Sequence, residues 1–157
     1  MKSKRRAKAA PTTVQTAFWD TSAIVPLCCL QAQSGQARQT ARVYARQVVW
    51  WVSLVECMSS FYRLAREGHL TIRETRQALE RVEYLRGRWA EVQPTEEVRR
   101  QAERLLRTHR LRAADALQLS AALVWCANHP RGRTFVGADN NLAEAAESEG
   151  FLVIRLI

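Results

Sequence analysis

Four acidic residues of this 157-residue chain stand where a carboxylate could take part in chemistry. Asp20 follows the apolar run TAFW, and Asp139 follows TFVGA. Glu56 comes shortly after VVWWV, and Asp115 is the single acid in the apolar stretch from Arg110 to Leu123. Burying a carboxylate is costly unless a partner compensates its charge. We therefore expect the four side chains to face one site with a cationic partner.

The chemistry that such a cluster would support is that of a divalent metal ion. Two carboxylates about 4 Å apart repel each other by about 4 kcal/mol at an effective dielectric constant near 20. A divalent cation removes this repulsion, and oxygen ligands suit Mg²⁺ or Mn²⁺. Such an ion activates a bound water and stabilises the charge on a phosphodiester under attack. The acids therefore predict metal-assisted hydrolysis of a phosphodiester.

Glu56 also has a purely structural interpretation. It follows Ser53 by three residues, which is the spacing of a capping box at the start of a helix. The segment TIRE, from Thr71 to Glu74, has the same spacing with no site implied. A capping role and a place in the site do not exclude each other, because a cap can also direct the side chain.

The three aspartates have structural interpretations as well. Asp20 and Asp139 could each cap the helix that follows. Asp115 could interact with the dipole of its helix or pair with Arg112. The joint placement of the acids favours a shared site, because independent caps need not fall at one edge of a sheet.

Strands and helices alternate along the chain from end to end. This order predicts a three-layer α/β sandwich, in which helices flank a central, mainly parallel sheet. In such sheets ligands bind outside the carboxyl ends of the strands, where the four acids are expected. The predicted strands are residues 16–19, 48–52, 89–93, 134–139 and 151–157, and the predicted helices are residues 21–30, 33–47, 53–70, 71–87, 95–109, 110–123 and 141–150.

Composition and charge limit the classes of protein that fit this sequence. No apolar run reaches the roughly 18 residues of a transmembrane helix, and no apolar signal core follows the basic N-terminus, so we expect a cytoplasmic protein without a membrane partner. The net charge of +9 suits a polyanionic partner and equally a solvated surface with a basic tail. Residues 1–15 are predicted to form a disordered basic tail, and residues 16–157 a single domain.

The four cysteines do not have the paired spacing of zinc ligands. We expect them to be free thiols that pack as small apolar side chains in the core. They are Cys28, Cys29, Cys57 and Cys126.

The segments that hold the four acids resemble the PIN domain family, in particular the VapC-type toxins of toxin–antitoxin pairs. WDTSAIVPL is similar to the family's opening strand and turn, and SLVECMSSFYRLAREGHL to its glutamate-bearing helix. LRAADALQLSAAL is similar to its A-D-A segment, and TFVGADNNLAEAAESEGFLVIRL to its closing strand, acid, helix and strand. The resemblance covers residues 16–157, and the order of the four segments makes it specific.

This resemblance implies a central parallel sheet between helices and the activity of a Mg²⁺- or Mn²⁺-dependent endoribonuclease. It also implies an RNA substrate, a small antitoxin as protein partner, and a homodimer. Ser22 would hydrogen-bond a ligand carboxylate. Carried over by position, the residues that bind the metal and take part in catalysis are Asp20, Glu56, Asp115 and Asp139.

The sequence departs from the family's pattern at positions beside the acids. Gln118 stands where many relatives have histidine, and Gly137 stands where a hydroxyl residue often precedes the last acid. A non-catalytic RNA- or protein-binding module on the same fold is the alternative, although concentrated negative charge does not help a protein to bind RNA. A phosphatase or receiver-like domain with Asp20 as nucleophile is disfavoured, because DTSAI lacks a second acid two residues later.

Overall fold

The computed structural model describes residues 14–157, so most of the predicted basic tail lies outside the described residues. The described part contains one five-stranded sheet with the order β3-β2-β1-β4-β5. All of its strand pairs are parallel, which confirms the predicted fold class. The strands are β1 (Thr16–Trp19), β2 (Arg46–Trp50), β3 (Ala90–Val92), β4 (Thr134–Gly137) and β5 (Leu152–Arg155).

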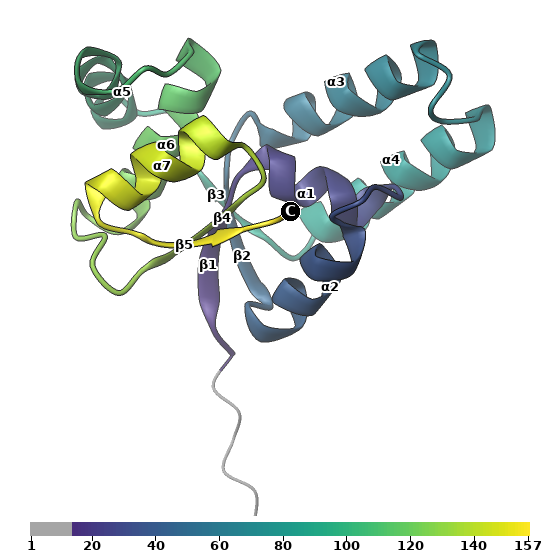
Figure 1. Ribbon diagram of the computed structural model, residues 1–157, viewed down its shortest axis with the longest axis horizontal. Coiled ribbons are helices and arrows are strands. Elements are labelled where there is room, and N and C mark those ends of the chain that lie inside the picture. The colour runs from purple at the N-terminus through teal and green to yellow at the C-terminus, as the bar shows by residue number, and fades with distance from the viewer. Residues whose placement is uncertain (1–13) are drawn as a thin grey trace, which may run out of the picture.

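Helices cover both faces of the sheet and complete the three layers (Figure 1). The chain moves from β1 to β3 in one direction and places α1–α4 on one face; β4 and β5 follow on the other side of β1, with α5–α7 on the opposite face. No described helix has the length and apolarity to span a membrane. The helices are α1 (Thr21–Cys28), α2 (Ser34–Val43), α3 (Ser53–Arg66), α4 (Ile72–Arg86), α5 (Glu96–Thr108), α6 (Ala113–Trp125) and α7 (Asn140–Glu149).

Each face of the sheet has its own apolar core, because successive side chains of a strand point to opposite faces. Phe18 of β1 stacks on Phe135 of β4, with ring centroids 5.6 Å apart, in the core under α5–α7. Its neighbours Ala17 and Trp19 pack in the other core, under α1–α4. All four cysteines are free and buried, as predicted.

The neighbouring strands β1 and β4 form the switch point of the sheet. The connection from β1 leads toward β2 on one side, whereas the connection from β4 leads to β5 on the other. The backbone N–H of Asp20 donates to the carbonyl of Val136 at 2.9 Å and extends this pairing beyond the end of β1. In open parallel sheets, ligands bind in the crevice outside the carboxyl ends of such a strand pair.

The predicted boundaries of β2 were wrong. The sequence pattern predicts a strand over residues 48–52, whereas the strand is Arg46–Trp50, and α2 before it is correspondingly shorter than predicted. The first residue of β2 pairs with Thr16, so the ladder with the central strand includes two polar residues at the start of β2. Trp51 lies beyond the strand and is 50% exposed, although it belongs to the apolar run VVWWV.

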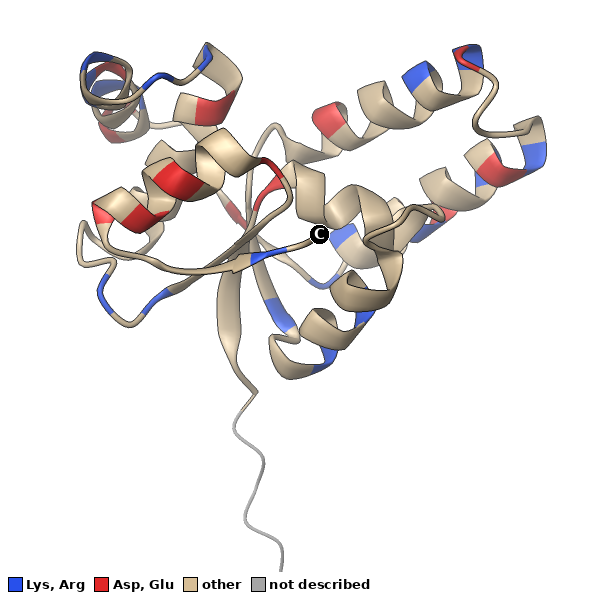
Figure 2. Ribbon diagram, in the orientation of Figure 1, with Lys and Arg blue, Asp and Glu red and all other residues tan. Residues whose placement is uncertain are grey.

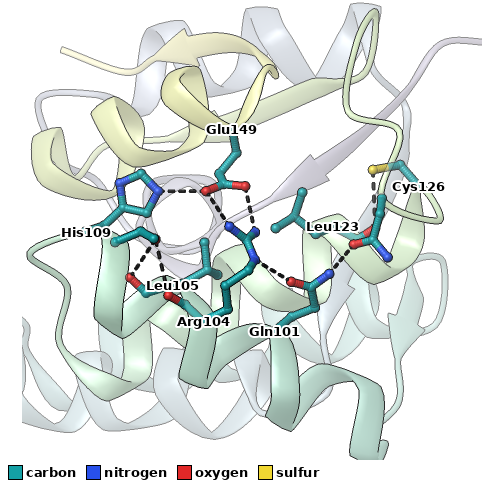
Figure 3. Close-up of polar contacts among 9 residues, drawn as sticks. Gln101, Arg104, Leu105, His109, Leu123, Cys126 and Glu149 are labelled. Carbon is teal, nitrogen blue, oxygen red and sulfur yellow. Dashed lines mark hydrogen bonds and ion pairs between the residues drawn. The ribbon is translucent and has the colours of Figure 1, made fainter.

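A cluster of polar side chains joins α5 to the end of α7 (Figure 3). The guanidinium of Arg104 donates to both carboxylate oxygens of Glu149, at 3.1 and 2.7 Å. His109 Nε2 lies 2.7 Å from Glu149 Oε1, and Gln101 accepts a hydrogen bond from Arg104 Nε at 2.9 Å. This cluster fixes the two helices against each other, and Glu149 is compensated there by a permanent positive charge.

Candidate active site

The structure places the four predicted acids around the carboxyl edge of the sheet. Asp20 directly follows β1, and Asp139 follows β4 by two residues. Glu56 lies in the first turn of α3, and Asp115 in the first turn of α6. In Figure 2, acidic positions lie on these elements around the upper ends of the central strands. Three of the four are the only aspartates in the chain.

Asp20 is the most buried of the four acids, with 5% of its surface exposed. It is the N-cap of α1, and its carboxylate accepts hydrogen bonds from the backbone N–H of Ser22, at 3.1 Å, and from the Ser22 hydroxyl. The same hydroxyl accepts a hydrogen bond from the N–H of Ala138 at 2.8 Å. Ser22 therefore holds the Asp20 carboxylate and ties the β1–α1 turn to the segment after β4.

Burial raises the pKa of Asp20 to about 7, although the hydrogen bonds from Ser22 lower it. The negative charges of Glu56 and Asp115 contribute to this raised pKa. Asp20 is thus close enough to two other acids to be destabilised by them when it ionises.

Asp115 interacts electrostatically with Asp139 as well as with Glu56. Its pKa is raised by burial first and then by the charge of Asp139, whereas a hydrogen bond from the backbone of Arg112 lowers it. The charge of Glu56 raises it as well. The charge of Arg112 also lowers this pKa, although within residues 14–157 none of the four acids takes part in an ion pair.

The predicted capping box of Ser53 and Glu56 was wrong. The N-cap of α3 is Val52, and no side chain bonds to the backbone there. The Glu56 carboxylate is used elsewhere: its Oε2 accepts a hydrogen bond from the Thr21 hydroxyl at 2.5 Å and one from Gln118 Nε2 at 2.6 Å.

The other segment with this spacing behaves as predicted. Thr71 is the N-cap of α4, and its hydroxyl accepts a hydrogen bond from the Glu74 N–H at 3.2 Å. The Glu74 carboxylate in turn accepts one from the Thr71 N–H at 2.8 Å. The two segments differ because the glutamate of α4 is exposed, whereas the glutamate of α3 faces polar partners from other elements.

Thr21 and Gln118 are the site residues whose role the sequence did not reveal. Both are buried, and they come from α1 and α6 respectively. One clue was available: Gln118 is an amide in an otherwise apolar segment, three residues after Asp115. Residues three apart share a helix face, so the amide of Gln118 is expected on the same face of α6 as Asp115.

Asp139 is exposed and is the N-cap of α7, where its Oδ1 accepts a hydrogen bond from the N–H of Leu142 at 2.8 Å. The capping interpretation is therefore confirmed for this residue. Asp139 also lines a cavity of about 280 Å³ together with Ser22, Ser60 and Arg63. This cavity puts a positive side chain of α3 beside the acidic edge.

By their chemistry, the acidic side chains at this edge suit a hard divalent cation. Among the described residues, no three or more histidine, cysteine, aspartate or glutamate side chains are gathered closely enough to hold a metal ion as they stand. The fit rests on Asp20, a buried carboxylate that interacts with further acids and has no basic partner in the described part of the chain. Carboxylate oxygens are the ligands that Mg²⁺ and Mn²⁺ prefer.

Comparison with known proteins decides the family. The family profile described as PIN domain matches residues 17–147. The chain belongs to the PIN domain family. Members of this family are nucleases, which agrees with the acidic edge of the sheet. No curated protein matches the sequence.

Two solved structures share the PIN fold with this chain. The Mycobacterium tuberculosis toxin VapC20, described as cleaving the sarcin–ricin loop, is 21% identical with a TM-score of 0.60, and the match covers 89% of this chain and 99% of VapC20. PAE2754 from Pyrobaculum aerophilum is 17% identical with a TM-score of 0.57, over 90% of this chain and 91% of that protein. At these identities the likeness establishes the fold.

Proposed function

We propose that this PIN domain protein is a metal-dependent endoribonuclease and the toxin of a toxin–antitoxin pair. The observation that supports this most directly is Asp20, which is buried, has a pKa raised to about 7, and interacts with Glu56 and Asp115. Its ionised form is disfavoured by burial and by the neighbouring acids more than the Ser22 hydrogen bonds favour it. A divalent cation would make its ionised form tolerable.

Within this proposal the residues that would hold Mg²⁺ or Mn²⁺ are Asp20, Glu56, Asp115 and Asp139. The bound cation supplies a more acidic water and stabilises negative charge on the phosphodiester. Asp20 is oriented by Ser22 before any ligand arrives, because the Ser22 hydroxyl and N–H both donate to it. Such preorganisation lowers the cost of assembling the site.

The choice of RNA as substrate rests on the likeness to VapC20 and on local charge. Arg63 lines the cavity beside Asp139, and among the described residues its guanidinium is paired only with the exposed Glu67, at 3.5 Å. A surface ion pair of this kind is weak. The guanidinium of Arg63 is therefore available to a phosphate group that approaches the acidic edge.

The proposal includes two protein partners, an antitoxin and a second copy of the chain. A groove of about 420 Å³ between α3 and α4 offers a largely apolar lining, including Tyr62, Ile72 and Leu79. Exposed apolar side chains such as Ile72, 84% exposed, are typical of surfaces that bind another protein. A toxin of this kind would act in the cytoplasm, where its RNA substrates lie.

The experiment that tests the activity is RNA cleavage by the purified full chain with Mg²⁺, with Mn²⁺ and with excess EDTA. We expect cleavage with either cation and none with EDTA. The substitutions Asp20→Asn and Asp115→Asn should each lower the rate by at least about 100-fold, since metal assistance contributes several kcal/mol to the transition state. Size-exclusion chromatography with light scattering tests the homodimer.

A matched control is Glu144→Gln, which removes an exposed carboxylate of α7, five residues after Asp139. This variant should cleave RNA at the wild-type rate. Equal cleavage in EDTA would contradict the metal mechanism. Binding of RNA without turnover in both cations would favour the non-catalytic binding module instead.

A further inference from the structure

Glu56, Thr21 and Gln118 form a closed hydrogen-bond network. The Thr21 hydroxyl donates to Glu56 Oε2 at 2.5 Å, and Gln118 Nε2 donates both to Glu56 Oε2 at 2.6 Å and to Thr21 Oγ1 at 2.7 Å. Thr21 and Gln118 are 8% and 2% exposed. The three residues come from α1, α3 and α6, so the network joins both sides of the candidate site.

The direction of every bond in this network follows from the carboxylate. An ionised carboxylate only accepts, so the single proton of the Thr21 hydroxyl must go to Glu56. The hydroxyl is then an acceptor toward Gln118, whose amide has two N–H groups for these two close acceptors. Ser53 Oγ lies farther from Gln118 Nε2, at 3.4 Å. The reversed amide would bring its oxygen against the carboxylate, and that arrangement is repulsive.

Gln118 adopts this orientation at the expense of its own oxygen. Oε1 of Gln118 is buried and has no hydrogen-bond partner among the described residues. A buried acceptor without a partner is destabilising. Such a local conflict is typical of functional sites, where the position of one group outweighs the stability of another.

Both donors bind the same oxygen of Glu56. Within residues 14–157 none of the hydrogen bonds to Glu56 involves its Oε1. One oxygen is thus held by two neutral donors, and the other has no hydrogen-bond partner among the described residues. Neutral donors orient a carboxylate without cancelling its negative charge, which a lysine or arginine would do.

We propose that Thr21 and Gln118 are positioning residues that hold Glu56 through Oε2 and leave Oε1 to a divalent cation or its water. This inference rests on the proposed function, because it concerns the same metal site. It assigns a role to two residues that are not ligands themselves. The side chain of Gln118 is an amide, which does not titrate, so the donor behind Glu56 stays neutral at every pH at which the protein is folded.

The test measures Mn²⁺ binding to the full chain, by the electron paramagnetic resonance signal of free Mn²⁺, beside RNA cleavage. Gln118→Met removes the donor at similar side-chain length, and Thr21→Val removes the hydroxyl at nearly constant shape. Each should weaken Mn²⁺ binding by about 10- to 100-fold, as loss of a partner behind a metal ligand does. Thr21→Ser, which keeps the hydroxyl, should bind Mn²⁺ within a few-fold of the wild type.

Ser120→Ala is the matched control on the same helix. Ser120 is fully buried, and its hydroxyl donates to the carbonyl of Val98 at 2.5 Å, in the core away from the acids. This variant should unfold at a lower temperature but bind Mn²⁺ like the wild type. If Gln118→Met also changed only the unfolding temperature, its role would be structural and the inference wrong.

A measurement on the metal-free wild type keeps the inference testable even if a variant fails to fold. The side-chain amide protons of Gln118 should exchange slowly with solvent in nuclear magnetic resonance spectra. Their chemical shifts should move when Glu56→Gln removes the charged acceptor. Fast exchange, or shifts insensitive to Glu56→Gln, would show that the network does not persist in solution.

Mn²⁺ binding distinguishes failure of the metal site from failure of the positioning role. The proposed metal-dependent function is contradicted if the wild type binds no Mn²⁺, or if Asp20→Asn binds Mn²⁺ as tightly as the wild type does. A wild type that binds Mn²⁺, with unchanged affinity in folded Gln118→Met and Thr21→Val, contradicts only the role of the positioning residues. Failure of Thr21→Ser to retain binding also counts against it, since the hydroxyl would not be the group that matters.

Discussion

Asp20 and Glu149 are two carboxylates withdrawn from solvent in opposite surroundings. Partial burial raises the pKa of Glu149, but the hydrogen bonds from Arg104 and His109 outweigh it, so the pKa lies below its ordinary value (Figure 3). Burial, helped by the charges of neighbouring acids, raises the pKa of Asp20 to about 7. The comparison separates a carboxylate that serves stability from one kept at a cost in stability.

The largest expected difference is between Asp20→Asn and Glu149→Gln. Asp20→Asn should lower the rate of RNA cleavage by about 100-fold or more. It should leave the free energy of unfolding of the metal-free protein equal or higher, because a buried charge is removed. Glu149→Gln should retain cleavage and lower the free energy of unfolding by about 1–3 kcal/mol, as loss of charged hydrogen bonds does. Cleavage rates and urea unfolding measure both.

Two results would contradict this contrast between Asp20 and Glu149. Loss of cleavage in a folded Glu149→Gln variant would mean that the α5–α7 cluster acts on the site. A marked loss of stability in Asp20→Asn would mean that Asp20 is primarily the N-cap of α1.

The pH dependence of stability should have opposite signs for the two residues. Between pH 3.8 and about 7, folded Asp20 keeps a proton that the unfolded chain has released, so the free energy of unfolding falls as pH rises, by a few kcal/mol in all. The contribution of Glu149 is present above its ordinary pKa of 4.5 and is lost as pH falls below that value. Both statements apply to the metal-free protein in EDTA.

Differences between wild type and variant isolate each residue in these titrations. Subtracting the Asp20→Asn curve should leave a decline that ends near pH 7. Subtracting the Glu149→Gln curve should leave a gain confined to pH values above about 4. A flat difference curve for Asp20→Asn would show that its carboxylate is not suppressed by burial.

Adding Mn²⁺ should stabilise the acidic edge and leave the Glu149 cluster unaffected. At about 100 times the dissociation constant, binding raises the free energy of unfolding by about 2.7 kcal/mol. Wild type and Glu149→Gln should gain the same amount, whereas Asp20→Asn should gain much less. Thermal unfolding with and without Mn²⁺ measures the effect, and an equal gain in Asp20→Asn would place the bound ion elsewhere.

The smallest effect concerns the two segments with capping-box spacing. Thr71→Ala should lower the free energy of unfolding by about 1 kcal/mol, because α4 loses its N-cap, and leave cleavage unchanged. Ser53→Ala removes no cap, since Val52 holds that position in α3. Ser53→Ala should therefore not lower the free energy of unfolding by the amount that loss of a cap does. If it reduces cleavage while the helices stay intact, the reason would be the lost 3.4 Å contact between Ser53 and Gln118.

The fold could be predicted to a large extent, because its signals are local. The strands and helices alternate in hydrophobic patterns that span only a few residues, and the caps at Thr71 and Asp139 are set by residues three positions apart. The start of β2 was misjudged because its first residues are polar and belong to the strand only through pairing with β1.

The candidate site was predicted in outline and not in detail. The positions of the acids follow from the ends of strands and the starts of helices, which the sequence pattern marks. The partners of Glu56 were not predictable in this way, because Thr21 lies 35 residues before it and Gln118 lies 62 residues after it. The same local spacing gave a capping box at α4 and a different arrangement at α3.

The sequence by itself determined which segments become strands and helices and which of them end or begin with a carboxylate, since these properties depend on neighbours along the chain. Only the tertiary structure decided that α1, α3 and α6 meet around Glu56. It also decided that, among residues 14–157, Glu149 pairs with Arg104 whereas Asp20 has no basic partner. The physical reason is that hydrogen-bond and charge partners are chosen by proximity in space. That proximity is set by the order of the strands and by the face on which each helix packs.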